Sequence, residues 1–250
     1  MSEFVTEKIE AGVQYICLNR TDKKNAITLE MYQALTELLH FAEQNSEVKA
    51  SMIFGAGDDF SSGNDIKEFI QIAQTPEKME SIMAFLQMLS GYKKPLLAGV
   101  EGRAVGVGAT MLLHCDMVVA SRSAKLQFPF VQLGVVPEAA SSHLLPQLVG
   151  HQKAFEMLIL GDFIDAKEAH DMKMLNHLCE PGEAFQVAQM YAQKIAALPV
   201  EAVALSKDLL KYREQDDVQM ALMREGRIFK DRLKSQEAYQ AFAAFLSRNK

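Results

Sequence analysis

Two strand-like segments of this chain are each followed by a glycine-containing loop and then by the start of a helix. Val48 to Phe54 leads through one such loop into a helix from Asp65, and Leu96 to Val100 leads through another into an apolar helix that we expect to end at Leu113. Strands that alternate with helices predict an α/β core. Periodicity does not distinguish a spiral arrangement of the strands from a doubly wound one.

The second half of the chain is dominated by helical patterns. From about Glu183 onward it is nearly all helix, with a break at Leu198-Pro199, and the last helix is expected from Ser235. In the first half, Thr28 is a candidate N-cap for a helix with apolar residues at helical spacing. Further expected elements are strands at 13–19, 117–120 and 125–128, a helix opening at Thr75-Pro76-Glu77, a helix near Ser141, and a final apolar stripe of Ala238, Phe242 and Phe245.

Composition excludes several classes of protein. The formal charge of -6 argues against nucleic-acid binding, which normally uses a basic surface, although a few lysines can still form a local anion site. The three cysteines form no CxxC pair, so neither a zinc site nor a disulfide framework is indicated. No apolar stretch is long enough to span a bilayer, and neither a signal peptide nor a Ser-Lys-Leu ending is present. We therefore expect a soluble cytoplasmic protein without a metal.

The two glycine-containing loops are candidate anion sites. Gly102, Gly106 and Gly108 precede a helix, as does Ser62-Gly63-Asn64-Asp65, and helix starts expose unpaired N–H groups. Taken alone, such glycines more often mean close packing of a helix on a strand, and a turn with an Asp or Asn cap explains the second loop. Because an oxyanion hole needs two converging donors, two such loops are more suggestive than one.

Glu138 is the most suggestive carboxylate because it lies in the apolar run Val135-Val136-Pro137-Glu138-Ala139. Burial would raise its pKa towards useful basicity, whereas the alternative is that it caps the following helix. His114-Cys115-Asp116 cannot converge on a metal because adjacent helix positions point apart. Ser141, Ser142 and His143 cannot form a triad for the same reason. Several apolar side chains either line a ligand pocket or belong to the core, namely Met79, Ile82, Met83, Leu86 and Met88.

Taken in order, these motifs resemble the crotonase (enoyl-CoA hydratase/isomerase) superfamily. The resemblance extends over nearly the whole chain, and its order and spacing are more specific than any single motif. The matching segments are Leu18-Asn19-Arg20 with Asn25-Ala26, 60–66, Lys94-Pro95 with 102–106, Cys115-Asp116, Phe128, Leu133-Gly134, Pro137, Phe229 and 235–238.

The resemblance implies a spiral of ββα units over residues 1–195, followed by a helical C-terminal region, 196–250, that serves trimerisation and part of the CoA site. It implies a homotrimer or a dimer of trimers, and an acyl-CoA thioester as substrate, with no separate cofactor because CoA is part of the substrate. The N–H groups of Asn64 and Val107 would form the oxyanion hole, and Phe229 and Lys230 would reach CoA from a neighbouring subunit. The expected CoA-binding residues are Lys24, Ala26, Ser62, Gly63, Asp65 and Ile66.

Departures from the family pattern indicate the reaction. Hydratases of the family use two glutamates, whose positions correspond here to Thr110 and Phe130, and neither can act as a general base. Glu138 instead matches the single glutamate of the Δ3,Δ2-enoyl-CoA isomerases. The resemblance therefore implies an isomerase that converts 3-enoyl-CoA to trans-2-enoyl-CoA in fatty-acid β-oxidation.

Two alternatives stay open. One is another reaction of the family, namely hydration, thioester hydrolysis or dehalogenation. The other is a non-catalytic member that only binds acyl-CoA. Acyl chain length cannot be deduced from these residues.

Overall fold

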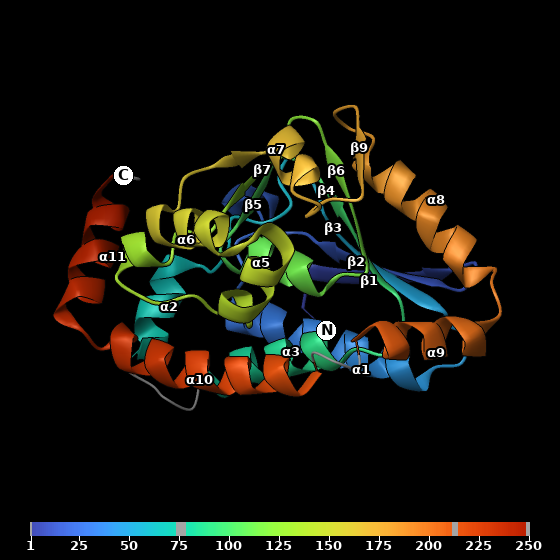
Figure 1. Ribbon diagram of the computed structural model, residues 1–250, viewed down its shortest axis with the longest axis horizontal. Helices are drawn as coiled ribbons and strands as arrows, with labels where there is room; N and C mark the ends of the chain where they lie inside the picture. Colours follow the sequence, from blue (N-terminus) through green and yellow to red (C-terminus); the bar gives the residue numbers. More distant parts are fainter. Residues whose placement is uncertain (1, 74–78, 212–214, 249–250) are drawn as a thin grey trace.

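Two β-sheets form the centre of the protein in the computed structural model, which describes residues 2–73, 79–211 and 215–248 (Figure 1). The larger sheet has the strand order β1-β2-β3-β4-β6-β9 and is parallel except for the antiparallel pair β1 and β2. Its strands are β1 (Val5–Glu10), β2 (Val13–Leu18), β3 (Ala50–Gly55), β4 (Leu96–Val100), β6 (Met117–Ser121) and β9 (His177–Cys179). The smaller sheet, in the order β5-β7-β8, contains β5 (Arg103–Val105), β7 (Lys125–Gln127) and β8 (Ile164–Asp165).

From β4 to β7, consecutive strands alternate between the two sheets. β4 and β6 belong to the larger sheet, whereas β5 and β7, which follow them in the chain, pair in the smaller one. After β3, a single bridge from Ser61 to Ala104 places the following loop beside β5 in the same way. The pairs β4–β5 and β6–β7 thus each add one strand to each sheet before the next helix, which is the pattern of a spiral of ββα units. The predicted α/β fold and its helical C-terminal region are confirmed.

Helices surround both sheets. In chain order they are α1 (Leu29–Gln44), α2 (Ile66–Ala73), α3 (Met79–Gly91), α4 (Val107–Thr110), α5 (Ser141–Val149), α6 (His151–Leu160), α7 (Ala166–Asp171), α8 (Ala184–Ala196), α9 (Val200–Lys211), α10 (Gln215–Leu233) and α11 (Gln236–Arg248), with 3₁₀ turns η1 (Thr21–Lys23), η3 (Met111–His114) and η4 (Val131–Leu133). As predicted, Thr28 caps α1 by accepting a hydrogen bond from the N–H of Met31 at 3.3 Å. The expected helix opening at Thr75-Pro76-Glu77 lies outside the described residues.

The expectation of one apolar helix ending at Leu113 is wrong. α4 ends at Thr110, and the chain continues as the 3₁₀ turn η3 to His114. The turn tightens because the N–H of Cys115 bonds back to the carbonyl of Leu112, and β6 begins at Met117, leaving no room for another α-helical turn. This tight turn ends at His114, whose ring contacts the carbonyl of Ala139.

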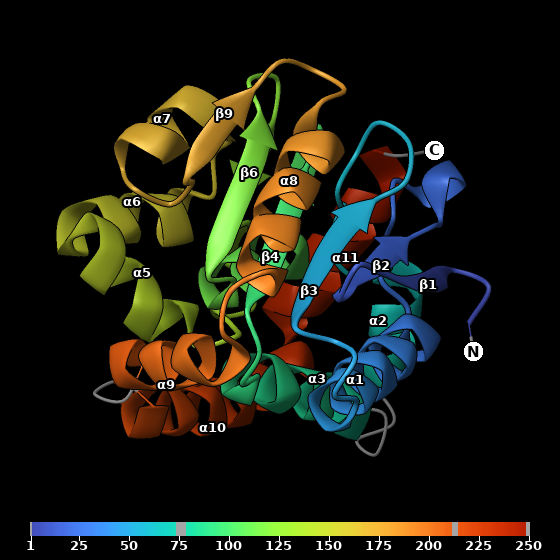
Figure 2. The same cartoon turned by 90° about the vertical axis from the view of Figure 1, so that its right-hand side faces the viewer.

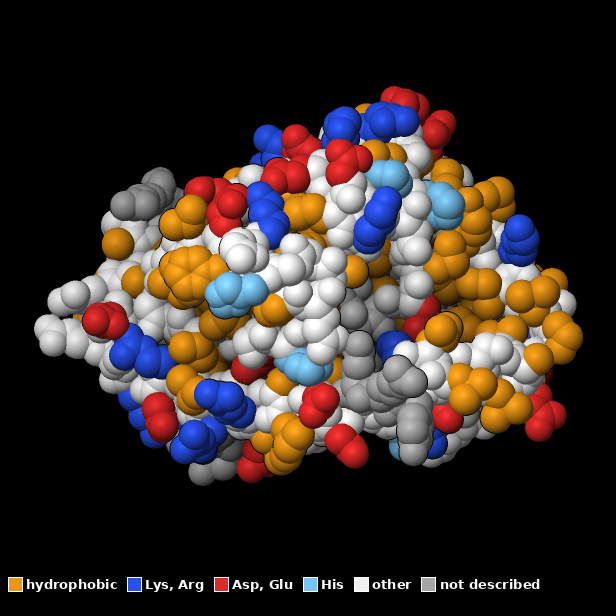
Figure 3. Space-filling view, viewed as in Figure 1, with side chains coloured by type: hydrophobic (Ala, Val, Ile, Leu, Met, Phe, Trp, Pro, Cys, Tyr) orange, Lys and Arg blue, Asp and Glu red, His pale blue; other side chains and the backbone are white. Residues whose placement is uncertain are grey.

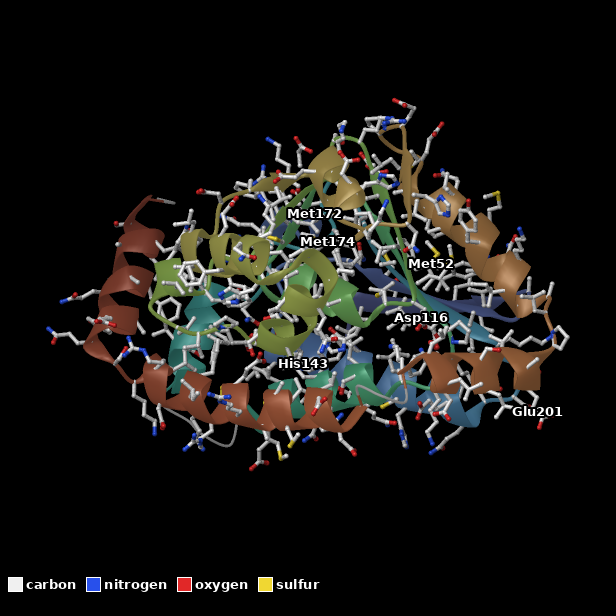
Figure 4. All side chains as sticks on the ribbon, viewed as in Figure 1. Met52, Asp116, His143, Met172, Met174 and Glu201 are labelled. Atoms are coloured by element: carbon white, nitrogen blue, oxygen red, sulfur yellow. The ribbon has the colours of Figure 1, made fainter. Side chains whose placement is uncertain are left out.

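The two faces of the larger sheet bury separate apolar clusters. One face packs on α8, whose alanines at four-residue spacing, Ala184, Ala188, Ala192 and Ala196, let the helix lie close to the strands (Figure 2). Met52 fills the space between this face and α8 (Figure 4). The other face covers the main core with α1 and α3. The functional loops described below lie on the side of the main core.

An ion pair attaches the C-terminal helices to the sheet. Lys207 of α9 is buried and contacts Asp116 at 2.7 Å, and the same carboxylate accepts the N–H of Leu96 at 2.8 Å (Figure 4). The predicted division at residues 195 and 196 falls next to the end of α8 and stays a prediction. Within the described residues, no helix combines the length and apolar character needed to cross a membrane.

Candidate active site

The two glycine-containing loops meet, as the sequence predicts. A Cβ built on Gly63 would lie 2.7 Å from the carbonyl oxygen of Val105, so these backbones approach as closely as only glycine permits. The contact is fixed by hydrogen bonds, because the N–H of Val105 bonds to the carbonyl of Ser61 at 2.9 Å and the N–H of Ile27 bonds to that of Gly63 at 2.7 Å. The loops after β3 and β5 therefore form one surface.

This surface carries two main-chain donors that are free of hydrogen bonds within the described residues, the N–H groups of Asn64 and Val107. Val107 is the first residue of α4, so its N–H has no intrahelical partner. Gly106 precedes it with a φ of 55°, which turns the chain into the helix. Both donors belong to the pair of touching loops, so they are candidates for the two donors of an oxyanion hole.

Tyr32 connects the Asn64 loop to the acidic part of the site. Its hydroxyl donates to the side-chain oxygen of Asn64 at 2.6 Å, and the tyrosine is fully buried. Burial raises the pKa of Tyr32 well above its usual range, and the negative charge of Glu138 raises it further. This charge effect indicates that Glu138 lies near Tyr32, although the two residues are far apart in the sequence.

Glu138 is a buried carboxyl group without a full set of hydrogen bonds. Its side chain is 6% exposed, and its Oε1 is the one buried side-chain oxygen or nitrogen without a partner in the described part of the chain. Burial, and then the charge of Glu225, raises the pKa of Glu138 to about 8. The unpaired carboxyl lines an otherwise mostly apolar cavity, whose other walls are Phe69, Met79, Ile82, Met83, Leu86, Ala139, Leu222, Glu225, Gly226 and Phe229.

The methionine-rich segment of α3 lines part of this cavity. Met79, Ile82, Met83 and Leu86 of α3 line the same cavity as Glu138, whereas Met88 is not part of its wall. These side chains also belong to the core or pack against it, while their role in a ligand pocket stays a prediction.

The turn after Glu138 has a strained backbone. Ala139 and Ala140 have φ values of 57° and 56°, a left-handed conformation that costs a residue with a Cβ about 1–2 kcal/mol. The hypothesis that Glu138 caps the following helix is wrong. The N-cap residue of α5 is Ala140, and the side chain that accepts the N–H groups of Ala140 and Ser142 is that of Glu225. The carboxyl of Glu138 is therefore left to face the cavity.

The segments expected to bind CoA lie side by side. The N–H of Ser62 bonds to the carbonyl of Lys24 at 2.9 Å, and the N–H of Asp65 bonds to that of Ile27 at 3.0 Å. Lys24 and Ser62 are near the surface, whereas Gly63 and Ala26 are buried. Asp65 pairs with Arg20 at 2.8 Å and also accepts the N–H groups at the start of α2, where Ile66 begins the helix, so it has a structural role as well.

Phe229 and Lys230, expected near CoA of a neighbouring subunit, differ in exposure. Phe229 is buried within its own chain, where its ring packs edge-on against Phe69 at 5.8 Å and lines the Glu138 cavity. Lys230 is exposed. Only Lys230 is therefore free to contact a ligand outside its own chain.

The other polar motifs have structural contacts. His114 approaches the carbonyl of Ala139 at 2.8 Å, and burial lowers its pKa to about 4, so the neutral ring donates this hydrogen bond. Asp116 pairs with Lys207, while Cys115 is a free thiol. Ser141 donates its hydroxyl to the carbonyl of Glu138 at 2.6 Å. No cluster of three His, Cys, Asp or Glu side chains suitable for a metal occurs among the residues the structure describes.

Three residues of the site were missed in the sequence, namely Tyr32, His114 as a donor to the Glu138 turn, and Glu225. The sequence does contain a signal for Glu225, namely a carboxylate on an apolar helix face. Glu225 lies on the apolar face of α10, where the other buried positions are Val218, Leu222, Phe229 and Leu233. A carboxylate at such a position needs a buried partner, which the sequence does not identify.

Comparisons with known proteins identify a matching family and similar structures. The model of the Enoyl-CoA hydratase/isomerase family matches residues 8–250. Among solved structures, OdaA of Pseudomonas aeruginosa superposes with a TM-score of 0.94 at 37% identity, covering 98% of this chain and 99% of that one.

Curated relatives carry the names of more than one activity. Enoyl-CoA delta isomerase 2 of Rattus norvegicus is 34% identical over 96% of this chain, which spans only 62% of that protein's length. Short-chain-enoyl-CoA hydratase of Clostridium acetobutylicum is 29% identical, over 100% of this chain and 97% of its own length.

Proposed function

Because the chain belongs to the enoyl-CoA hydratase/isomerase family, we propose that it moves the double bond of 3-enoyl-CoA to the trans-2 position in fatty-acid β-oxidation. The observation that carries the proposal is the buried, unpaired Oε1 of Glu138 beside an apolar cavity. A base with a raised pKa accepts a proton readily, and an apolar cavity suits an acyl chain. The loops with two free main-chain donors provide the second requirement of thioester enolisation.

One carboxylate is enough for this reaction. Glu138 removes a proton from C2 of the substrate, and the electrons of that C–H bond form a dienolate whose negative charge resides on the thioester oxygen. The N–H groups of Asn64 and Val107 hold this oxygen as the charge develops. The protonated Glu138 then returns the proton to C4, and the double bond moves from C3–C4 to C2–C3. The N–H of Asn64 is positioned by the Tyr32 hydrogen bond to its side chain.

Hydration of 2-enoyl-CoA is the second candidate function, since relatives carry that name. It would need a second free acid or base. Glu225 is the other carboxyl group in the cavity wall, but both of its oxygens accept main-chain N–H groups, at 2.7 and 2.9 Å. Thr110 and Phe130 are buried and carry no carboxyl group. These contacts favour isomerisation.

Parallel assays with 3-enoyl-, 2-enoyl- and saturated acyl-CoA separate the alternatives. We expect turnover of the 3-enoyl thioester alone. Consumption of 2-enoyl-CoA to a 3-hydroxy product would replace the proposal with hydration, and release of free CoA would replace it with hydrolysis. Binding without turnover of any substrate would identify a non-catalytic member.

The pH dependence of kcat/KM follows from the pKa of Glu138, which is about 8. The base must be ionised, so kcat/KM should rise about tenfold per pH unit below pH 8 and level off above it. The folded pKa is raised, so the ionised, active form is the minor one at neutral pH. Stopped-flow or coupled assays from pH 5.5 to 9.5 measure this profile, and a rate independent of pH between 6 and 8 contradicts it.

Acyl chain length should depend on Gly226 of α10. A Cβ at this position would lie 3.0 Å from the sulfur of Met83, so a leucine would press against Met83 in the wall of the cavity into which we propose that the acyl chain extends. We expect Gly226→Leu to lower kcat/KM about tenfold or more for a twelve-carbon 3-enoyl-CoA, while a six-carbon substrate keeps its rate within about twofold. Gly91→Leu, where a Cβ meets nothing within 4 Å, is the control. Equal losses on both substrates would exclude the cavity as the chain-length site.

The CoA moiety binds, in this proposal, along the adjoining segments that hold Lys24, Ala26, Ser62, Gly63, Asp65 and Ile66.

We also propose a cytoplasmic homotrimer or dimer of trimers. Exposed apolar side chains over α6 and the loop after it, Phe155, Ile159, Leu160 and Phe163, support burial against another copy (Figure 3). Light scattering at micromolar concentration tests the assembly.

A further inference from the structure

We propose that Glu225 is a positioning residue, whose carboxylate holds the left-handed turn after Glu138 and thereby directs the Glu138 carboxyl into the cavity. The inference rests on the proposed function of Glu138. It assigns to α10, 87 positions further along the chain, a part in the reaction that does not require contact with the substrate.

The turn needs an external support. Two successive alanines adopt φ values of 57° and 56°, which residues with a Cβ take up only when the surroundings compensate. The contacts of its polar groups show where that support lies. Glu225 Oε2 accepts the N–H of Ala140 at 2.7 Å, Glu225 Oε1 accepts the N–H of Ser142 at 2.9 Å, and His114 donates to the carbonyl of Ala139 at 2.8 Å.

Glu225 is the main support from outside the turn because both of its contacts are charge-assisted, and the one to Ala140 is buried while the one to Ser142 is part-buried. The carboxylate is 6% exposed and bonds N–H groups at the start of α5, where a negative charge is favourable. Apart from the bond that His114 donates to Ala139, the remaining contacts are local, since the N–H and hydroxyl of Ser141 both bond the carbonyl of Glu138. Without Glu225, the N–H of Ala140 would be buried without a partner, and the N–H of Ser142 would lose its only acceptor among the described residues.

Glu225 also acts on Glu138 through its charge. Burial is the largest cause of the raised pKa of Glu138, and the negative charge of Glu225 is the second. The other titratable groups near the turn are Tyr32 on α1, whose pKa lies well above neutral, and His114 on η3, which is neutral. Lys211 on α9 affects the pKa of His114. Within this set, removing the charge of Glu225 should lower the pKa of Glu138.

The test is Glu225→Gln, which keeps the volume but removes the charge and one acceptor. We expect kcat on 3-enoyl-CoA to fall about 10- to 100-fold with KM within about threefold, because the turn shifts while the CoA contacts remain. The midpoint of the kcat/KM profile should move to lower pH. Asp217→Asn, an exposed charge on the same helix, is the control and should leave both quantities unchanged. A lower melting temperature with an unchanged kcat and pH profile would reduce Glu225 to a stabilising residue.

A second pair of variants separates a shifted turn from general damage. Glycine adopts positive φ without strain, so Ala140→Gly in the Glu225→Gln background should recover part of the lost kcat. Absence of any recovery would overturn the positioning role.

A direct measurement does not depend on activity. The side-chain carboxyl signal of Glu138 can be followed by ¹³C NMR and assigned by its loss in Glu138→Gln. If its titration midpoint is the same with and without Glu225→Gln, the inference fails, whatever reaction the enzyme catalyses. If the midpoint moves down while 3-enoyl-CoA is not turned over, the inference stands and the proposed reaction fails.

Discussion

Glu138→Gln is expected to abolish the isomerisation of 3-enoyl-CoA, with kcat lower by about 10²- to 10⁴-fold, because no other free carboxyl group lines the described cavity. The amide keeps the size of the side chain but cannot accept the C2 proton. The measurement is the rate of 2-enoyl-CoA formation under single-turnover conditions, together with exchange of the C2 proton in deuterium oxide.

The control for Glu138→Gln is the same substitution, glutamate to glutamine, at an exposed position outside the candidate site. Glu201→Gln suits this purpose, since Glu201 is exposed on α9 at the edge of the molecule (Figure 4). CoA affinity and melting temperature should stay near the parent values in both variants. Because folding raises the pKa of Glu138 from 4.5 to about 8, its carboxyl group costs the fold stability increasingly as the pH rises between these values, so replacing it with an amide is not destabilising at neutral pH. Turnover of Glu138→Gln at the parent rate would exclude Glu138 as the base.

Gly63→Ala is expected to have the second largest effect. Its Cβ would lie 2.7 Å from the carbonyl of Val105, so the two loops that carry the Asn64 and Val107 donors must separate. Displacing one oxyanion donor costs about 2.7–4 kcal/mol, equivalent to a loss of about 10²- to 10³-fold in kcat. This substitution tests main-chain donors that side-chain replacement at 64 or 107 cannot remove.

Gly182→Ala is the matched control for Gly63→Ala. Gly182 has the same φ of 87°, but an added Cβ there meets nothing within 4 Å. Both variants pay the left-handed backbone cost, and only Gly63→Ala forces the loops apart. Similar losses of kcat in both would mean that backbone strain, and not the donor geometry, explains the effect. Similar thermal stability with divergent kcat would support the oxyanion site.

Much of the fold was predictable because its signals are local. The strand over 96–100, the Thr28 cap and the helices of the last third follow from apolar spacing and capping chemistry, which act within a few residues. Four strands were missed. β5, β8 and β9 have only two or three residues, too few for a periodic pattern, whereas the six-residue β1 was overlooked at the start of the chain. The helix to Leu113 was overextended because the 3₁₀ turn depends on where β6 must begin.

The site was predictable where it consists of consecutive residues. The Ser62-Gly63-Asn64-Asp65 loop, the glycines before α4 and the apolar run around Glu138 are visible as motifs, and the structure brings the two loops together. Whether Glu138 capped a helix or faced a cavity was not predictable, since either role suits a carboxylate after a proline. The answer depended on Glu225, which takes the capping position from another helix.

The sequence alone determined the α/β class, the two glycine loops and the one glutamate in an apolar run, because each depends on residue type and spacing within a short segment. Only the tertiary structure decided the spiral order of the strands, the environment of Glu138 and the roles of Tyr32, His114 and Glu225. These depend on contacts between segments far apart in the chain. A carboxyl group's desolvation and its neighbouring charges, which set its pKa, exist only once those segments have packed.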